Sequence, residues 1–453
     1  MRLYSSLSRR KEELPPPPGP IRMYFCGPTV YQRIHIGNAR PFVISMWLKR
    51  WLELQGYTAT LVENITDIND KIYDAAPGAS AKLAADASLW YVEDTGRLGL
   101  GRPDHEPKAS ETVSEIVALI EELVRCGLAY EAGGDVYFRV ARYAEYGRLS
   151  GQRPDEVQEQ EPNPLKEDPR DFALWKATKE GEDTSWDSPW GRGRPGWHIE
   201  CSAMAERFLG PSFEIHGGGL DLIFPHHENE LAQSRGAGRE FARVWMHNGM
   251  LRLTGEKMSK SLGNIATLQE VLDEWGAETV LLFFLTAHWR KPIDFSEETM
   301  AAARAQVGSF SEVQRVAAAR ESAAGWGEFV EALNNDFDTP AALAILHEWR
   351  DAGQTDLLHR GLNVFGLAFE RLPEDRRDVT INVPAAGAQA TALTVSVRIV
   401  GDAPERVRKL AEERHVARLQ KEYTMADAIK DEIRVLGWEV QDEIDGYGLV
   451  PLR

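Results

Sequence analysis

The sequence predicts an α/β fold built on a parallel sheet, and the segment from residue 22 to residue 64 carries this prediction. Residues 22–25 alternate polar and apolar side chains, with aromatic residues among them, as a short buried strand does. Residues 39–55 place apolar side chains at the period of a helix, which Gly56 ends. Residues 58–64 are again strand-like. A strand, a helix and a second strand in this order form a crossover unit with parallel strands.

The turn between the first strand and the helix holds residue types that suit a ligand site. The string Cys26-Gly27-Pro28-Thr29 ends the strand, because Gly and Pro together mark a sharp turn. His35 and Asn38, in the string HIGN, stand where the helix begins. Ligands of open α/β sheets bind at the carboxyl ends of the strands. We therefore expect the Cys26 thiol and the His35/Asn38 pair to face one crevice.

Length and composition limit the possible classes of protein. A chain of 453 residues can form two to four domains. Acidic residues outnumber basic ones, 70 against 52, and the net charge of −18 argues against a general nucleic-acid coating protein. Three cysteines do not form a disulfide framework, so we expect a reducing, cytoplasmic compartment. The N-terminus has no apolar signal core, and the most apolar run, Thr279 to Leu285, is too short to span a membrane.

Further elements are expected along the chain. Residues 1–20 are polar and end in PPPPGP, which predicts an extended, mobile lead-in. Residues 79–100 and 110–125 are expected helices, the second of them amphipathic. Cys126 follows this helix and is expected as a small core residue. Asp135 to Val140 is an expected short strand.

Candidate metal ligands occur in the block from Trp197 to Glu230. Pro225 suits the first turn of a helix, and His226 and Glu230 then lie at i and i+4 on one face, a usual spacing for two metal ligands. With Cys26 and Cys201 they make a tetrahedral zinc set of two thiols, one imidazole and one carboxylate.

Spacing alone leaves other interpretations of this block open. Cys26 is far from Cys201 in the sequence and no CxxC pair exists, so two core thiols and a histidine near a helix cap fit the pattern equally well. His227 and Glu228 are neighbours that could replace the chosen ligands, and His227 lies at i, i+3 from Glu230.

A third block, Lys257-Met258-Ser259-Lys260-Ser261, combines two lysines and two hydroxyl groups on an expected loop before a helix. Lysine is a point charge that can follow a moving phosphate, so Lys257 and Lys260 could grip a polyphosphate. In isolation, an ordinary solvated loop of Lys and Ser explains the string at least as well.

Together these blocks resemble a known family. HIGN and KMSKS are similar to the paired ATP-binding signatures of the class I aminoacyl-tRNA synthetases. The surrounding strings resemble the cysteine-specific branch, the cysteinyl-tRNA synthetases: FCGPTVY, NITDINDK, FALWK, GWHIECSAM, HGGGLDLIFPHHENE, WMHNGM and KMSKSLGN. The resemblance covers about residues 20–345 and resumes at about 405–440, whereas residues 371–403 match nothing in it.

The resemblance implies a Rossmann-type parallel-sheet catalytic domain that is split by an insertion and followed by a helical bundle and a small C-terminal anticodon-side module. The expected ranges are a flexible lead-in 1–20, a first catalytic half 21–110, a connective insertion 111–196, a second catalytic half 197–244, a stem-contact segment with the KMSKS loop 245–306, a helical bundle with an uncertain linker 307–400, and an anticodon-binding module 401–453.

The resemblance also implies roles for single residues. His35, Asn38, Lys257 and Lys260 are the expected catalytic residues that contact ATP. The fourth position of the first signature is Asn38, which can donate a hydrogen bond but cannot carry charge. The other implied residues fall into three groups: Gly217, Gly218 and Asp221 for the adenosine of ATP; Cys26, Cys201, His226 and Glu230 for one zinc ion per chain; Thr66 and Trp197 for the cysteine pocket. Mg²⁺ is expected to accompany ATP.

The implied reaction joins ATP and L-cysteine to cysteinyl-adenylate and then transfers cysteine to tRNA(Cys), in an enzyme expected to be a monomer without membrane contact. Residues 405–436 form an expected basic helix or helix pair, in which Arg414 and Arg418 suit a phosphate backbone, although interleaved acidic residues also fit a salt-bridged surface. Trp438 could stack on an anticodon base or lie in a core.

Two rival functions remain possible at this point. A related ligase that joins cysteine to a small amine, such as an amino sugar, would need the same ATP and zinc residues but no anticodon module, and residues 405–440 argue against it. A noncatalytic tRNA-binding paralogue would not need intact His35, Asn38, Lys257 and Lys260.

Overall fold

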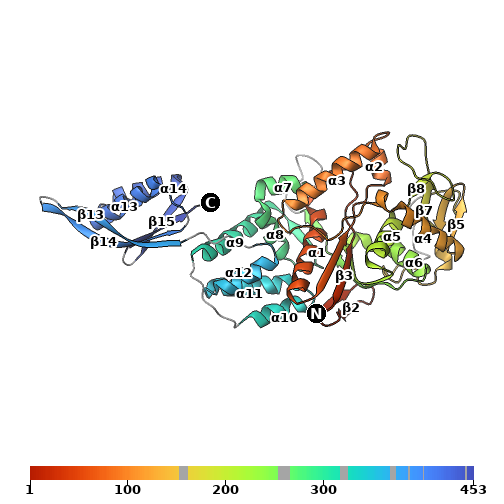
Figure 1. The fold of residues 1–453 in the computed structure, drawn as a ribbon, viewed down its shortest axis with the longest axis horizontal. Helices are drawn as coiled ribbons and strands as arrows, with labels where there is room; N and C mark the ends of the chain where they lie inside the picture. Colours follow the sequence, from red (N-terminus) through yellow and green to blue (C-terminus); the bar gives the residue numbers. More distant parts are fainter. Residues whose placement is uncertain are drawn as a thin grey trace. The chain divides into compact units, whose positions relative to one another are not determined.

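A computed structural model describes residues 1–152, 162–253, 266–316, 325–367, 374–385, 388–400, 402–443 and 446–452 (Figure 1). The chain divides into two compact units, residues 1–309 with 321–368 and residues 310–320 with 369–453. Lys257 and Lys260 lie outside the described residues.

The larger unit is organised around a four-stranded sheet in the order β10-β9-β3-β4, and all neighbouring strands are parallel. The strands are β3 (Pro20–Phe25), β4 (Thr58–Glu63), β9 (Ser212–Gly219) and β10 (Phe241–Asn248). Helix α1 (Ile36–Leu54) connects β3 to β4, so the predicted crossover unit is confirmed. The register aligns Phe25 with both Glu63 and Gly217, which brings the carboxyl ends of these three strands to one edge.

The segment between β4 and β9 inserts helices and a second, antiparallel sheet in the order β5-β6-β7-β8. Its elements are α2 (Asp70–Ala75), α3 (Ser80–Gly96), η1 (Ala109–Glu111), α4 (Val113–Arg125), β5 (Ala129–Ala132), β6 (Asp135–Phe138), η2 (Val140–Arg142), β7 (Phe172–Ala177), β8 (Gly193–Pro195) and α5 (Trp197–Leu209). The expected helices near 79–100 and 110–125 and the strand at 135 are confirmed. Cys126 is exposed at the end of α4, so its prediction as a core residue is wrong.

Beyond β9, the larger unit continues through short helical turns into a helical region. The elements are η4 (Leu220–Leu222), η5 (Ile223–His227), α6 (Glu228–Gly236), β11 (Leu251–Leu253), α7 (Leu268–Trp275), α8 (Ala277–Leu285), β12 (Ile293–Phe295), α9 (Glu297–Val316), α10 (Trp326–Asn334), α11 (Thr339–Asp351) and α12 (Thr355–Val364). Strand β10 continues to Asn248, so the predicted boundary at residue 244 falls inside a strand. Residues 279–285, the most apolar run, are buried along α8.

The N-terminal segment is a folded hairpin, β1 (Arg2–Ser5) with β2 (Arg10–Glu13), and the predicted mobile lead-in is therefore wrong. Leu3 is fully buried, and the Tyr4 backbone N–H donates to the Asp336 carboxylate at 2.7 Å. Asp336 is almost fully buried in a left-handed backbone conformation (φ 73°) and also accepts from Arg290 Nη2 at 2.5 Å. The string NDFDTP thus ties the hairpin to the helical region.

We expect Asp336→Ala to lower the free energy of unfolding of the larger unit by about 2 kcal/mol, because it leaves the Arg290 charge and the Tyr4 N–H without their acceptor. Asp351, which is mostly exposed and pairs with Arg350, provides the matched control, and Asp351→Asn should change stability by less than about 0.5 kcal/mol. Chemical denaturation of both variants measures the difference. Equal stability of Asp336→Ala and the wild type would mean that the hairpin contact is dispensable.

The smaller unit is a four-stranded sheet in the order β13-β14-β16-β15 with two helices. Its elements are β13 (Glu374–Ala385), β14 (Ala388–Val400), α13 (Glu405–Leu419), α14 (Tyr423–Val435), β15 (Trp438–Glu443) and β16 (Gly446–Pro451). Residues 374–400, which the sequence analysis grouped with the bundle as an uncertain linker, pair through β14 with β16 instead. Their apolar side chains, Ile381, Val395 and Val397 among them, share one core with α13, α14 and β15.

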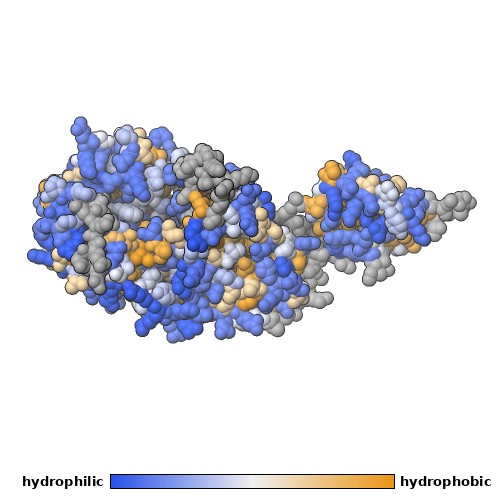
Figure 2. Space-filling model, turned by 180° about the vertical axis from the view of Figure 1, so that it is seen from behind, coloured by the Kyte–Doolittle hydropathy of each residue, from blue (hydrophilic) through white to orange (hydrophobic). Residues whose placement is uncertain are grey.

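Hydrophilic residues cover most of the face shown in Figure 2, with hydrophobic residues in small separate areas. Among the residues that the structure describes, none of the helices combines the length and the apolar composition that crossing a membrane would require.

Candidate active site

The carboxyl ends of the parallel strands border a cleft, as expected for an open α/β sheet. The cavity has a volume of about 370 Å³. Cys26, His35, Asn38, Trp197 and Asp221 are among the residues that line it. The structure therefore confirms that the Cys26 thiol and the HIGN string face one crevice.

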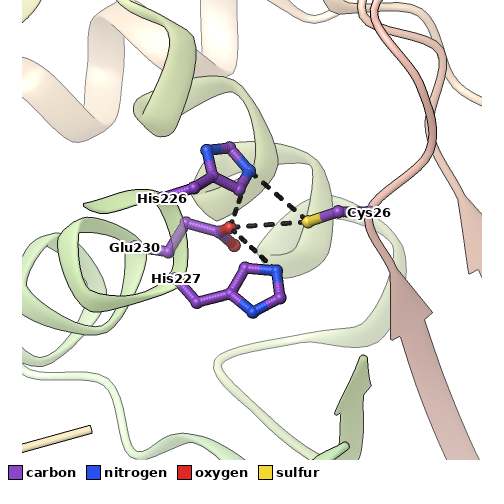
Figure 3. A group of neighbouring side chains, drawn as sticks. All are labelled: Cys26, His226, His227 and Glu230. Carbon is purple, nitrogen blue, oxygen red and sulfur yellow. Dashed lines mark hydrogen bonds and ion pairs between the residues drawn. The ribbon is translucent and has the colours of Figure 1, made fainter. Parts of the chain in front are cut away.

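Three predicted metal ligands meet at one end of this cleft (Figure 3). Cys26 follows β3, where its backbone N–H donates to the Gly217 carbonyl at 3.0 Å. Its sulfur lies 3.5 Å from His226 Nε2 and 3.5 Å from Glu230 Oε1. His226 Nε2 is 3.0 Å from the same carboxylate oxygen. All three side chains are buried, so these donor atoms form a possible metal-binding group shielded from water.

Cys201, the fourth predicted ligand, is buried on α5 and contacts Cys26, but among the described residues the clustered donor atoms belong to Cys26, His226, His227 and Glu230 and do not include Cys201. Burial opposes ionisation, but a hydrogen bond from Cys26 and the neighbouring imidazole of His226 lower the pKa of Cys201 to about 6. His226 responds in the opposite sense: burial would lower its pKa, but the charges of Glu230 and Cys201 raise it to about 10. A buried cluster with a carboxylate and an acidic thiol thus favours a cation at its centre.

Neighbouring side chains orient the possible ligands from outside. His216 Nε2 lies 2.7 Å from Glu230 Oε2, and His198 Nδ1 lies 2.9 Å from His226 Nδ1. The Trp197 ring stacks on the His226 ring with 4.4 Å between the centroids. A metal-bound histidine usually uses its second ring nitrogen in such a hydrogen bond, so this arrangement suits metal binding.

The two alternative ligands differ in their surroundings. Glu228 accepts the backbone N–H groups of Gly147 at 2.9 Å and Ser150 at 2.7 Å, so its carboxylate anchors the insertion. His227 does belong to the possible metal-binding group, with Nε2 3.9 Å from Glu230 Oε1. Its Nδ1 pairs with His247 Nε2 at 2.8 Å, while the ligand atoms of the four residues lie within 4.8 Å of one another, so His227 stays an alternative ligand.

The other end of the cleft presents the first turn of α1. His35 caps this helix: its Nδ1 accepts from the Asn38 backbone N–H at 3.3 Å. The half-buried ring has a lowered pKa because of burial, with Asp221 acting in the opposite direction. A helix N-terminus with free N–H groups attracts anions, so this end of the cleft suits phosphate.

The glycines of β9 divide between packing and the cleft. A side chain at Gly217 would collide with the Phe25 ring, and a β-carbon at Gly218 would lie 2.9 Å from Leu222 Cδ1. Gly219 and Asp221, rather than Gly217 and Gly218, are among the residues that line the cleft. Close packing thus explains the first two glycines without any contact to a ligand.

Of the two predicted cysteine-pocket residues, only Trp197 is among the residues that line the cleft. Thr66 is buried and accepts from Asn64 Nδ2 at 3.1 Å. Several cleft residues had no predicted role: Tyr31, Arg33, Lys71 and Asn248. Asn69 caps α2, and Lys71 lies in the first turn of this helix. The polar string INDK is the part of the sequence that could have indicated a helix start at the cleft.

The predicted tRNA contacts of the smaller unit need correction. Arg414 is buried and donates to both carboxylate oxygens of Asp442, at 2.7 and 3.1 Å. Arg418 is more exposed but pairs with the same carboxylate at 3.0 Å. Trp438 is buried in the core of the unit, so its ring is not available to stack on a base. The salt-bridged and core interpretations therefore hold for Arg414 and Trp438.

Comparisons with known proteins agree with this arrangement. A family model described as tRNA synthetases class I (C) catalytic domain matches residues 15–305. Curated relatives named cysteine--tRNA ligase include those of Halalkalibacterium halodurans, 40% identical over 98% of both chains, and Chromohalobacter salexigens, 42% identical over 98% of both chains.

Solved structures share the fold at low sequence identity. Mycobacterium tuberculosis methionyl-tRNA synthetase with methionyl-adenylate has a TM-score of 0.54, 15% identity, and coverage of 77% of this chain and 82% of that one. The ternary complex of Agrobacterium radiobacter K84 agnB2 LeuRS with tRNA and LeuAMS has a TM-score of 0.55, 12% identity, and coverage of 96% of both chains.

The parallel sheet, the HIGN turn at its edge and the matched family model define the catalytic domain of a class I aminoacyl-tRNA synthetase. Within that class, the similarity over nearly the whole length is specific: the chain belongs to the family of cysteine--tRNA ligases.

Proposed function

We propose that this enzyme activates L-cysteine with ATP to cysteinyl-adenylate, releases pyrophosphate, and transfers cysteine to tRNA(Cys). The observation that carries the proposal is the cleft, which joins a thiol, imidazole and carboxylate group at one end to a helix N-terminus at the other. The first end suits a thiol substrate and the second suits a nucleotide phosphate. Relatives that match over nearly the whole length are named cysteine--tRNA ligase, and this supports the proposal.

We propose one Zn²⁺ per chain, held by Cys26, Cys201, His226 and Glu230. Two soft thiols, an imidazole and a carboxylate match the preferences of zinc, and the acidic thiol of Cys201 supplies the deprotonated ligand that a metal needs. When bound, zinc favours a thiolate over the harder, less acidic hydroxyl of serine. An apolar pocket alone would separate cysteine from such a close analogue by only about 1–3 kcal/mol.

The residues of the chain carry the remaining steps. Trp197 borders the pocket beside His226 and excludes water from the bound amino acid, with Thr66 supporting the floor. His35, Asn38 and the first turn of α1 hold the phosphates of ATP with Mg²⁺, while Asp221 accepts from the ribose and Gly217 and Gly218 keep the strand close-packed below it. Lys257 and Lys260 stabilise the charge that develops at the α-phosphate as pyrophosphate leaves. No covalent enzyme intermediate is part of this proposal.

One incubation with cysteine, ATP and total tRNA tests the proposal against the two rival functions. We expect cysteine to become acid-precipitable on tRNA and AMP to accumulate. A parallel incubation with a small amine such as an amino sugar, in place of tRNA, should give no ligation product. Ligation to the amine without charging would favour the small-amine ligase, and absence of cysteine-dependent ATP–pyrophosphate exchange would favour a noncatalytic paralogue. Gel filtration checks the expected monomer.

A further inference from the structure

A second hollow of the larger unit, with a volume of about 470 Å³, lies where the C-terminal half of α1 meets α12 and the turn after α3. Arg50 on its wall is 14 residues along α1 from Ile36, so it lies about 20 Å from the cleft at the rise of an α-helix. The wall carries four cations and one carboxylate: Lys49, Arg50, Arg102, Arg360 and Glu53. The whole chain has a net charge of −18, whereas these five side chains carry more positive than negative charge.

Two of the four cations are neutralised within the protein. Lys49 Nζ lies 3.1 Å from Glu53 Oε1 and 3.1 Å from Asp104 Oδ1. Arg102 binds both carboxylate oxygens of Glu106, with its Nε 2.9 Å from Oε2. These two side chains therefore shape the wall of the hollow but add little net charge to it.

Arg50 and Arg360 have a different environment. Arg50 Nη2 donates to the Asn363 carbonyl at 2.8 Å, and burial lowers the pKa of Arg50, with Glu53 acting in the opposite direction. The Arg360 guanidinium lies 3.7 Å from the centroid of the Trp326 ring. Among the described residues, neither guanidinium has a carboxylate within ion-pair distance. Because the Trp326 ring covers only the face of the Arg360 guanidinium, the N–H groups at its edge can donate two parallel hydrogen bonds to an oxyanion.

We propose that this hollow is a binding site for a phosphate group, held by Arg50 and Arg360. Asn363 adds a side-chain N–H₂ beside them, and Met46 and Leu100 provide apolar parts of the wall. The phosphate can come from two sources, the backbone of the bound tRNA or a free polyphosphate. The tRNA source rests on the proposed function, since a chain of this net charge needs local positive sites to hold a polyanion.

The test compares an Arg50→Gln/Arg360→Gln double variant and the Arg360→Gln single variant with the wild type. Arg125, on helix α4 with a side chain that is 74% exposed, gives the control Arg125→Gln, which loses one positive charge as the Arg360→Gln single variant does. If the phosphate belongs to tRNA, we expect the KM for tRNA in charging to rise about fivefold or more in the double variant. The slope of log KM against the logarithm of the salt concentration should become shallower by about 1–2. Cysteine-dependent ATP–pyrophosphate exchange should stay unchanged in all variants.

Calorimetric titration with tripolyphosphate forms the second arm. For a free polyphosphate the wild type should bind one equivalent more than the double variant, while charging is unaffected. The single variant keeps the Arg50–Asn363 contact, so it controls for misfolding of the double variant. Thermal unfolding checks that every protein is folded. If neither the tRNA KM nor the tripolyphosphate stoichiometry differs between wild type and variants, the proposal is overturned. A wild type without any charging activity would instead refute the proposed function, and the tripolyphosphate arm would still report on the hollow.

Discussion

Cys201→Ser is expected to remove the bound metal and to lower cysteine-dependent ATP–pyrophosphate exchange by about 100-fold or more. This loss is larger than the loss of activity that follows when a metal ligand loses only a supporting hydrogen bond. The thiol is buried, and its pKa of about 6 suits the role of thiolate ligand that we propose for it. Serine is nearly the same size, but its hydroxyl is a harder donor and stays protonated at neutral pH. Elemental analysis of protein purified without added metal should find one zinc per wild-type chain and well below one in the variant.

Cys126 supplies the matched control for this change. It undergoes the same chemical substitution in Cys126→Ser, but it is exposed at the end of α4 and belongs to no donor group in the described part of the chain. Cys126→Ser should therefore keep both metal and activity. Full metal content in Cys201→Ser would remove Cys201 from the ligand set, and a fully active wild type free of zinc would refute the metal proposal as a whole.

The cleft could be predicted from the sequence because its residues sit in short local patterns. A strand that ends in Cys26-Gly27-Pro28 and a helix that begins at HIGN place two ends of the site without any knowledge of distant contacts. His226 and Glu230 likewise share one helical turn, and the structure brings Cys26 within 3.5 Å of both. Spacing alone could not separate His226, His227 and Glu228, and the structure sets aside only Glu228, whose carboxylate accepts from two backbone N–H groups, while both histidines stay in the donor group.

The errors share a different cause, which is partners far away in the sequence. The N-terminal hairpin is short and polar, and contacts with Asp336, more than 330 residues away, and with Trp245 and His247 of β10 hold it in place. Arg414 was predicted to contact a phosphate backbone, with a salt-bridged surface as the alternative, and its actual acceptor, Asp442, lies on a different element. Residues 374–400 are a different case: Val395, Val397 and Ile399 alternate with polar residues as in a half-buried strand, so this signal was present in the sequence.

The second large effect is expected from removing the smaller unit. A chain that ends at Leu367 should keep cysteine-dependent ATP–pyrophosphate exchange within about threefold of the wild type but charge tRNA at least about tenfold less efficiently, mainly through a raised KM, because phosphate contacts outside the cleft supply part of the affinity for tRNA. The cleft and the possible metal group lie wholly within residues 1–309, so activation does not need the removed part.

The position of the cut decides whether this experiment is informative. A chain that ends at Val400, the boundary expected from the sequence, would keep β13 and β14 but lose β16, α13 and α14, and would expose the apolar face that Ile381, Val395 and Val397 form. Such a chain should aggregate, and poor charging by it would say nothing about tRNA binding. The chain that ends at Leu367 avoids this exposed face, and its thermal unfolding should match the transition of the larger unit in the full chain. Unchanged charging by this folded, shortened protein would exclude the smaller unit from tRNA recognition.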